Sequence, residues 1–131
     1  MNRLKALAQH LEINAEEIHQ TAPDTFEVGS EEYLVLTDAE ADKATREQIV
    51  ESLWAFQPEF LAAHSDVDAE DFKTIQDNGK CESNNKLIKK LINDFDHFVN
   101  DAVLSDGRGH FLSGYDSEEN EVDQFFIYRR N

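Results

Sequence analysis

The sequence predicts an α+β fold, in which a small antiparallel sheet of three or four strands is packed by several helices. Two short aromatic and β-branched segments joined by a turn predict strands, and well-marked capping sequences predict helices. The chain has 131 residues, 40% of them apolar, with nine Phe, which favours a packed core over disorder. We therefore expect a single domain over 1–131, with an N-terminal helical pair at 1–22 and an α+β core at 23–131.

The N-terminal pair is predicted from residues 7–18, which resemble the first half of a helix-turn-helix. Asn14 and Glu17 are spaced as a capping box, and Ile13 and Ile18 as its hydrophobic staple. A DNA-reading second helix would carry basic or amide side chains, but here the most acidic stretch of the chain follows. We expect a packed helix pair that does not read DNA.

The strands come next. Residues 25–28 and 31–36 flank Gly29-Ser30, which suits a two-residue hairpin turn. Residues 124–129 form a closing strand, and 110–113 are expected to pair with it. Alternation gives the sheet two apolar faces. One face carries Tyr33, Val35, Phe125 and Ile127, and the other carries Leu34, Leu36, Phe126 and Tyr128.

Four helices are predicted after the hairpin. The first covers about 38–56, begins with a second capping box at 37–40 and buries Ile49, Val50, Leu53 and Trp54. Pro58 starts a short helix, and another short helix ends at Asn78-Gly79. The clearest pattern is an unbroken apolar repeat over 84–104, which predicts one amphipathic helix of about five turns.

The charge is strongly one-sided, with 28 acidic side chains against 12 basic ones and a net charge of −16. Residues 23–42 carry seven carboxylates and no Lys or Arg, and 101–123 carry seven against Arg108 alone. Such a field repels nucleic acids and anionic membranes and attracts basic protein surfaces. We therefore expect no direct nucleic-acid or membrane contact and a basic protein partner.

No apolar run reaches the length of a membrane span, and the N-terminus lacks the features of a signal peptide. The single cysteine, Cys81, excludes an internal disulfide. These features predict a cytoplasmic protein.

The glycine-rich segment 105–116 is the one candidate for catalysis. An enzyme would use His110 as acid or base, Asp106 or Asp116 to orient it, and Arg108 to hold an anion. The segment matches no phosphate-loop or dinucleotide fingerprint, however. A tight connection in which Arg108 pairs with local carboxylates is the favoured interpretation, so the chain leans away from being an enzyme.

No metal or cofactor site is predicted. The five histidines are scattered, without paired Cys/His spacing. His97 and Asp101 lie one helical turn apart and could share a metal only with ligands from elsewhere. The acidic run 116–121 places Glu121 where an EF-hand loop needs glycine, so a solvated acidic turn is expected.

Several segments together resemble a group of small acidic phage and prophage proteins: 26–29, 33–38, 51–56, 106–113 and 127–129. The resemblance covers most of the chain from about residue 24. It implies a viral origin, with action in the host cytoplasm, and supplies no mechanism.

Charge and resemblance together predict a non-enzymatic inhibitor that binds the nucleic-acid groove of a host defence or DNA-processing protein, as a DNA mimic does. Acids at helix starts are explained by folding, which leaves a surplus for partner binding. This surplus is Asp24, Glu27, Glu31, Glu32, Asp116, Glu118, Glu119, Glu121 and Asp123. It forms one surface if the Gly29-Ser30 turn and the loop before the last strand lie at the same end of the sheet.

Two alternatives stay open. One is a small enzyme or ligand-binding domain centred on Arg108 and His110. The other is self-association, for instance as a homodimer, through exposed aromatic side chains. The candidates are Phe56, Phe60, Phe111, Phe125 and Phe126.

Overall fold

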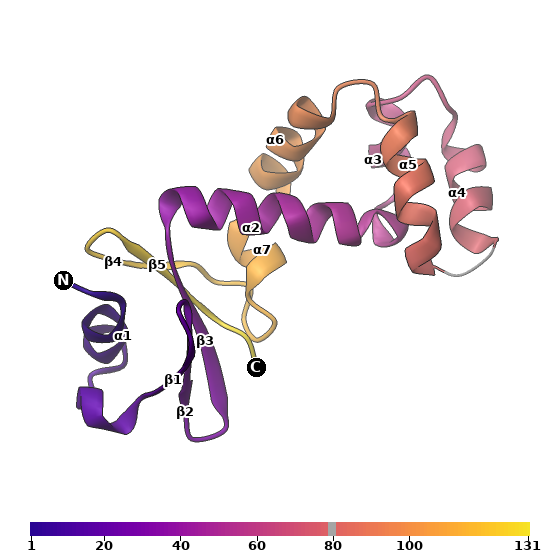
Figure 1. The fold of residues 1–131 in the computed structure, drawn as a ribbon. Coiled ribbons are helices and arrows are strands. Elements are labelled where there is room, and N and C mark those ends of the chain that lie inside the picture. The colour runs from indigo at the N-terminus through magenta and orange to yellow at the C-terminus, as the bar shows by residue number, and fades with distance from the viewer. Residues whose placement is uncertain (79–80) are drawn as a thin grey trace. The chain divides into compact units, whose positions relative to one another are not determined.

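The computed structural model describes residues 1–78 and 81–131 and confirms the α+β class (Figure 1). The described residues form an antiparallel sheet of five strands in the order β1-β2-β3-β5-β4. The strands are β1 His19–Ala22, β2 Thr25–Val28, β3 Glu31–Thr37, β4 Asn120–Val122 and β5 Phe125–Arg129.

The chain divides into two compact units. Residues 1–45 and 106–131 form the sheet unit, and residues 46–105 form the helical unit. The helices are α1 Arg3–Leu11, α2 Asp38–Glu51, α3 Pro58–Ala63, α4 Ala69–Asp77, α5 Asn85–Leu91, α6 Phe95–Asp106 and α7 Arg108–Leu112, with 3-10 turns at Ala15–Glu17, Leu53–Ala55 and Cys81–Asn84. Among the described residues, no helix has both the length and the apolarity needed to cross a membrane.

The predicted hairpin and the two sheet faces are confirmed. Val28 pairs with Glu31 across the two-residue turn, where Gly29 has a φ of 62° that favours glycine. On one face, α1 packs against the sheet through Ala6 and Leu7. The sheet residues of this face are Phe26, Tyr33, Val35, Phe125 and Ile127. The opposite face joins Leu34, Leu36 and Tyr128 to Ala41 of α2 and Leu112 of α7.

The start of α2 is a reciprocal capping box. Thr37 N donates to Glu40 Oε1 over 2.8 Å, and Glu40 N donates to Thr37 Oγ1 over 3.3 Å. Arg3 adds two hydrogen bonds to the same carboxylate, at 2.7 and 3.0 Å. The Arg3 bonds, followed by that from Thr37, lower the pKa of Glu40 from 4.5 to about 2.

The N-terminal helical pair is not formed. Helix α1 ends at Leu11, and Glu12 adopts a left-handed φ of 57°. Glu17 does accept the Asn14 N–H, as the capping box predicts, but only the 3-10 turn Ala15–Glu17 follows. Residues 19–22 then extend along β2 as the edge strand β1, whose ladder hydrogen bonds a second helix would forgo.

The single helix predicted over 84–104 is wrong, because α5 ends at Leu91 and α6 begins at Phe95. Between them, Ile92 bridges Ser65 and Asn93 N donates to the His64 carbonyl over 2.9 Å. Asp94 then caps α6 by accepting the His97 N–H at 3.2 Å. The apolar repeat continues through the break because each helix buries part of its apolar side, including Ile88 on α5 and Phe98 on α6.

Three smaller predictions also needed correction. Residues 108–112 form α7 rather than part of a strand, and the edge of β5 is covered instead by β4. The helix predicted over about 38–56 ends at Glu51. Trp54, predicted to be buried, is 37% exposed, whereas Ile49 and Leu53 are fully buried. The short helices at Pro58 and around Phe72 are confirmed. Gly79, proposed as the stop of the latter, lies outside the described residues.

Candidate functional site

Arg108 is the centre of an ion-pair cluster in the sheet unit. Its Nη1 lies 2.9 Å from Asp38 Oδ1 and 3.0 Å from Asp42 Oδ1, and its Nε lies 2.8 Å from Glu119 Oε1. The guanidinium also sits 4.7 Å from the centre of the Phe126 ring. The Arg108 side chain is only 11% exposed, so the cluster holds α7, the start of α2 and the loop before β4 together.

This arrangement gives Arg108 a structural role. Burial opposes its charge, but the hydrogen bonds with Glu119 and Asp38 outweigh burial and raise the pKa of Arg108. His110 is exposed and meets the Phe111 ring edge-on, and Asp106 is exposed and outside the cluster. The three residues of the catalytic alternative are therefore not brought together around a shared point.

The predicted partner-binding carboxylates lie at both ends of the sheet. Asn131 Nδ2 donates to the Ser30 carbonyl over 3.1 Å, and Ser113 Oγ donates to the Arg129 carbonyl over 2.7 Å. The hairpin turn and the start of the 114–119 loop thus share one end, as the one-surface hypothesis requires. Asp24 and Asp123 lie in the turns at the opposite end, next to strand pairs Thr25–Leu34 and Val122–Phe125.

Five of these carboxylates have internal partners. Asp24 accepts the Thr25 hydroxyl at 3.0 Å, and Asp123 lies 3.9 Å from the N-terminal amine of Met1. Glu31 accepts the Tyr33 hydroxyl at 2.7 Å and pairs with Arg129 at 3.1 Å, and burial, followed by this hydrogen bond, raises the pKa of Tyr33 to about 12. Glu119 accepts the Tyr128 hydroxyl in addition to Arg108. Asp116 accepts from Glu118 N at 3.0 Å and from Ser113 Oγ at 2.9 Å, which lowers the pKa of Asp116.

Four others have no hydrogen-bond or ion-pair partner for their carboxylates in the described part of the chain. They are Glu27, Glu32, Glu118 and Glu121. Glu27 and Glu32 lie directly opposite each other on β2 and β3 and point to the same face of the sheet. Like charges in such a pair destabilise a sheet, so folding does not explain them.

The aromatic candidates for self-association are largely packed within the chain. Phe56 and Phe60 each have ring centres 5.3 Å from that of Phe98. Phe125 is 5% exposed, and Phe126 lies under Arg108. In residues 1–78 and 81–131, the strongly exposed large apolar side chains are instead Met1, Trp54, Leu87, Leu104 and Tyr115.

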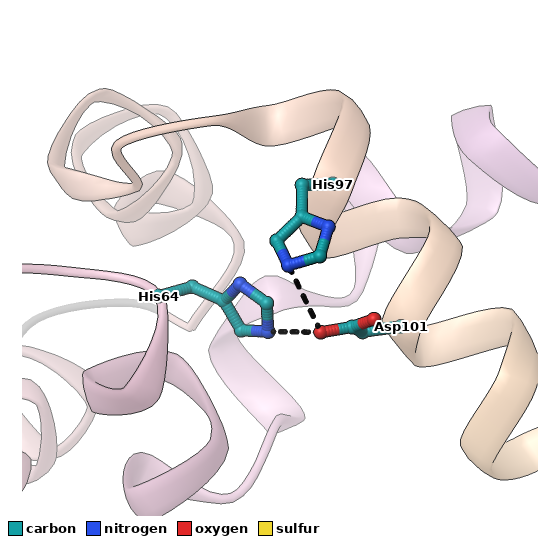
Figure 2. Close-up of side chains that lie close together, drawn as sticks. All are labelled: His64, His97 and Asp101. Atoms are coloured by element: carbon teal, nitrogen blue, oxygen red, sulfur yellow. Dashed lines mark ion pairs between the residues drawn. The ribbon is translucent and has the colours of Figure 1, made fainter.

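A second cluster, in the helical unit, joins His64 to His97 and Asp101 (Figure 2). Asp101 Oδ2 lies 3.1 Å from His64 Nε2 and 3.5 Å from His97 Nε2. The sequence identified the His97–Asp101 pair on α6 and the need for a ligand from elsewhere. It gave no signal for His64, which reaches the pair only because the end of α3 is bonded to the break between α5 and α6.

Comparison with known proteins adds no identification. A scan against protein-family models found no match, and neither the curated proteins nor the solved structures include a match to the chain.

Proposed function

We propose that this chain is a non-enzymatic acidic protein that binds a basic, nucleic-acid-binding surface of a partner protein. The observation that carries the proposal is the unpaired carboxylate pair Glu27–Glu32. Its position on a short, ordered hairpin places the two side chains on one face of the sheet, with Cβ atoms about 5 Å apart. A lysine- or arginine-rich groove that normally holds phosphates would be attracted to such a surface.

The distribution of cations supports the proposal. The sheet unit contains 16 acidic and 6 basic side chains, a net charge of −10, against −6 for the helical unit. Four of the five arginines are ion-paired within the chain, and the fifth, Arg130, has no side-chain ion pair with any residue that the structure describes. Because the arginines are engaged internally, the acidic excess is left for solvent or a partner.

The proposed contact surface is the hairpin end of the sheet unit, defined by Glu27, Glu32 and Glu118 together with Glu31 and Asp116. Glu31 and Asp116 are held by hydrogen bonds that orient their carboxylates. The first three carboxylates are free to meet incoming cations. Fixed and free acids side by side give a preorganised anionic surface, which lowers the ordering cost of binding.

The test uses the purified, tag-free chain coupled to a matrix and a bacterial lysate at low and high salt. The triple variant Glu27→Gln, Glu32→Gln, Glu118→Gln removes three charges from the hairpin end. A control with the same charge change carries Glu47→Gln, Glu59→Gln and Glu70→Gln, all exposed and all in the helical unit. Captured proteins are then assayed for binding to duplex DNA in the presence of each variant.

The proposal expects a salt-sensitive partner whose DNA binding is inhibited by the wild type and the control and weakly by the hairpin-end variant. Equal losses in both triple variants would mean that only net charge matters. A partner that neither binds nucleic acid nor responds to salt would overturn the proposal.

A further inference from the structure

We propose that His64, His97 and Asp101 form a binding site for Zn²⁺ in the helical unit. Two imidazole nitrogens and one carboxylate oxygen are a ligand set that Zn²⁺ accepts, with water in the fourth position. The site does not depend on the proposed partner surface, because all three ligands lie in the other unit.

The three ligand atoms already lie near zinc-binding distances. Zinc bonds to nitrogen and oxygen are about 2.0 to 2.1 Å long, so neighbouring ligand atoms of a tetrahedral site are about 3.3 Å apart. The two distances from Asp101 Oδ2 to the histidine Nε2 atoms, 3.1 and 3.5 Å, lie on either side of this value. All three ligand atoms lie within 4.8 Å of one another, so small movements of the side chains are enough to bring them to zinc-binding distances.

Backbone hydrogen bonds fix the position of His64, the ligand that comes from the end of another helix. His64 ends α3, and its carbonyl accepts the Asn93 N–H at 2.9 Å. Next to it, Ser65 Oγ donates to the Leu91 carbonyl over 2.6 Å. Because these bonds attach the end of α3 to the break that precedes α6, His64 is held opposite His97 and Asp101, as Figure 2 shows.

The surroundings are apolar on one side and open on the other. The His64 side chain is 10% exposed, and its ring contacts Phe60 at 5.4 Å and Phe98 at 5.3 Å between centres. His97, by contrast, is 62% exposed, so its imidazole can turn toward a metal without disturbing the core. The apolar side strengthens electrostatic attraction to a cation, and the open side admits the metal and its water.

A hydrogen-bonded trio without metal is the competing explanation, in which Asp101 accepts a hydrogen bond from an N–H of each imidazole. The zinc site and the hydrogen-bonded trio differ in the protonation of the histidine nitrogens that face Asp101. Coordination needs both facing nitrogens free of protons, whereas the hydrogen-bonded trio needs them protonated. Zinc should therefore displace protons from the cluster and shift the imidazole ¹⁵N resonances of both histidines.

The experiment is calorimetric titration of the tag-free chain with Zn²⁺, with Mg²⁺ as a control that prefers oxygen ligands. The variants are His97→Ala and Asp101→Asn, and His110→Ala serves as a matched exposed histidine outside the cluster. We expect one Zn²⁺ per chain, affinity at least about tenfold lower in the two cluster variants, and no change in His110→Ala. Zinc should also raise the thermal midpoint of the wild type more than that of His97→Ala.

The proposal is overturned by any of three results. One is the absence of saturable one-to-one Zn²⁺ binding at micromolar concentrations. Another is binding that His97→Ala leaves unchanged, and the last is an equal response to Mg²⁺, which would reflect only the negative charge of the chain. Circular dichroism of each variant confirms that a loss of binding is not a loss of fold.

Discussion

Glu27 on β2 and Glu32 on β3 lie directly opposite each other, and neither carboxylate has an ion-pair partner in the described residues. The arrangement opposes folding locally, because facing like charges destabilise a strand pair. Replacing Glu27 with Lys should therefore raise the free energy of unfolding by about 0.5 kcal/mol. The same variant should weaken binding to a basic partner, as expected where function and stability compete.

Urea denaturation measures the stability change. Glu121→Lys is the control. Glu121 on β4 lies opposite Phe126 on β5, so a lysine at this position would face no carboxylate across the strand pair. If Glu27→Lys lowers stability, or if Glu121→Lys raises it as much, the facing pair has no cost and the argument for its function fails.

Arg108 should be one of the most important polar residues for stability. Arg108→Met leaves Asp38, Asp42 and Glu119 without their shared cation, and we expect a loss of about 2 kcal/mol. Arg108→Lys should recover only part of the lost stability. The ammonium group keeps the positive charge, but it cannot engage all three carboxylates in the geometry of the guanidinium. Arg130→Met, at an exposed arginine that forms no ion pair within residues 1–78 and 81–131, should change stability by less than about 0.5 kcal/mol.

Thermal and urea denaturation of the three variants tests this account of Arg108. If Arg108→Met were as stable as the wild type, the ion-pair cluster would not be structural, and a ligand-binding role for the glycine-rich segment 105–116 would be open again.

Glu40 should contribute to stability in a pH-dependent way. Its pKa is about 2 in the folded chain against 4.5 for the free group, so its contribution is full above pH 4.5 and is lost as the pH falls toward 2. The carboxylate is 44% exposed, and solvent screening reduces the expected contribution to about 1 kcal/mol. Glu40→Gln should lose this amount at neutral pH.

The measurement is the free energy of unfolding from pH 7 to pH 2. The difference between wild type and Glu40→Gln should shrink as the pH falls below 4.5. Glu47→Gln, on the same helix but with no ion pair among the described residues, should give a curve parallel to that of the wild type. A difference that is constant with pH would contradict the role of Arg3.

Gly109 should resist substitution although it lies within α7. A methyl group there would come within 2.4 Å of the Ser117 carbonyl oxygen, which is part of the loop backbone. Helix propensity alone predicts that Gly109→Ala gains about 1 kcal/mol. We expect the opposite sign, a loss of about 2 kcal/mol by chemical denaturation, because the loop has to move. A gain would mean that the loop yields easily.

The sheet was the most predictable part of the fold, because strand alternation and turn chemistry are local. Gly29-Ser30 specifies the hairpin, and alternate residues of β3 and β5 identify both faces. The break at 92–94 was less visible, since the apolar repeat continues through it. Asn93-Asp94 was the available signal, as both residues favour helix starts.

The candidate sites were only partly predictable. Arg108 was correctly expected to pair with carboxylates, but Asp38 lies 70 residues away in sequence and no pattern connects the two. His64 lies at the end of a different helix from His97 and Asp101, and their meeting depends on hydrogen bonds to residues 91–93. Tertiary contacts of this kind leave no trace in composition or periodicity.

The most direct test of the proposed function is the salt dependence of affinity for the captured partner, measured between about 50 and 500 mM NaCl. Wild type should lose affinity steeply with salt, and the Glu27→Gln, Glu32→Gln, Glu118→Gln variant should bind more weakly and with a shallower slope. The control triple variant should retain the wild-type slope. Identical slopes for all three proteins would contradict the claim that the hairpin end is the surface that binds the basic partner.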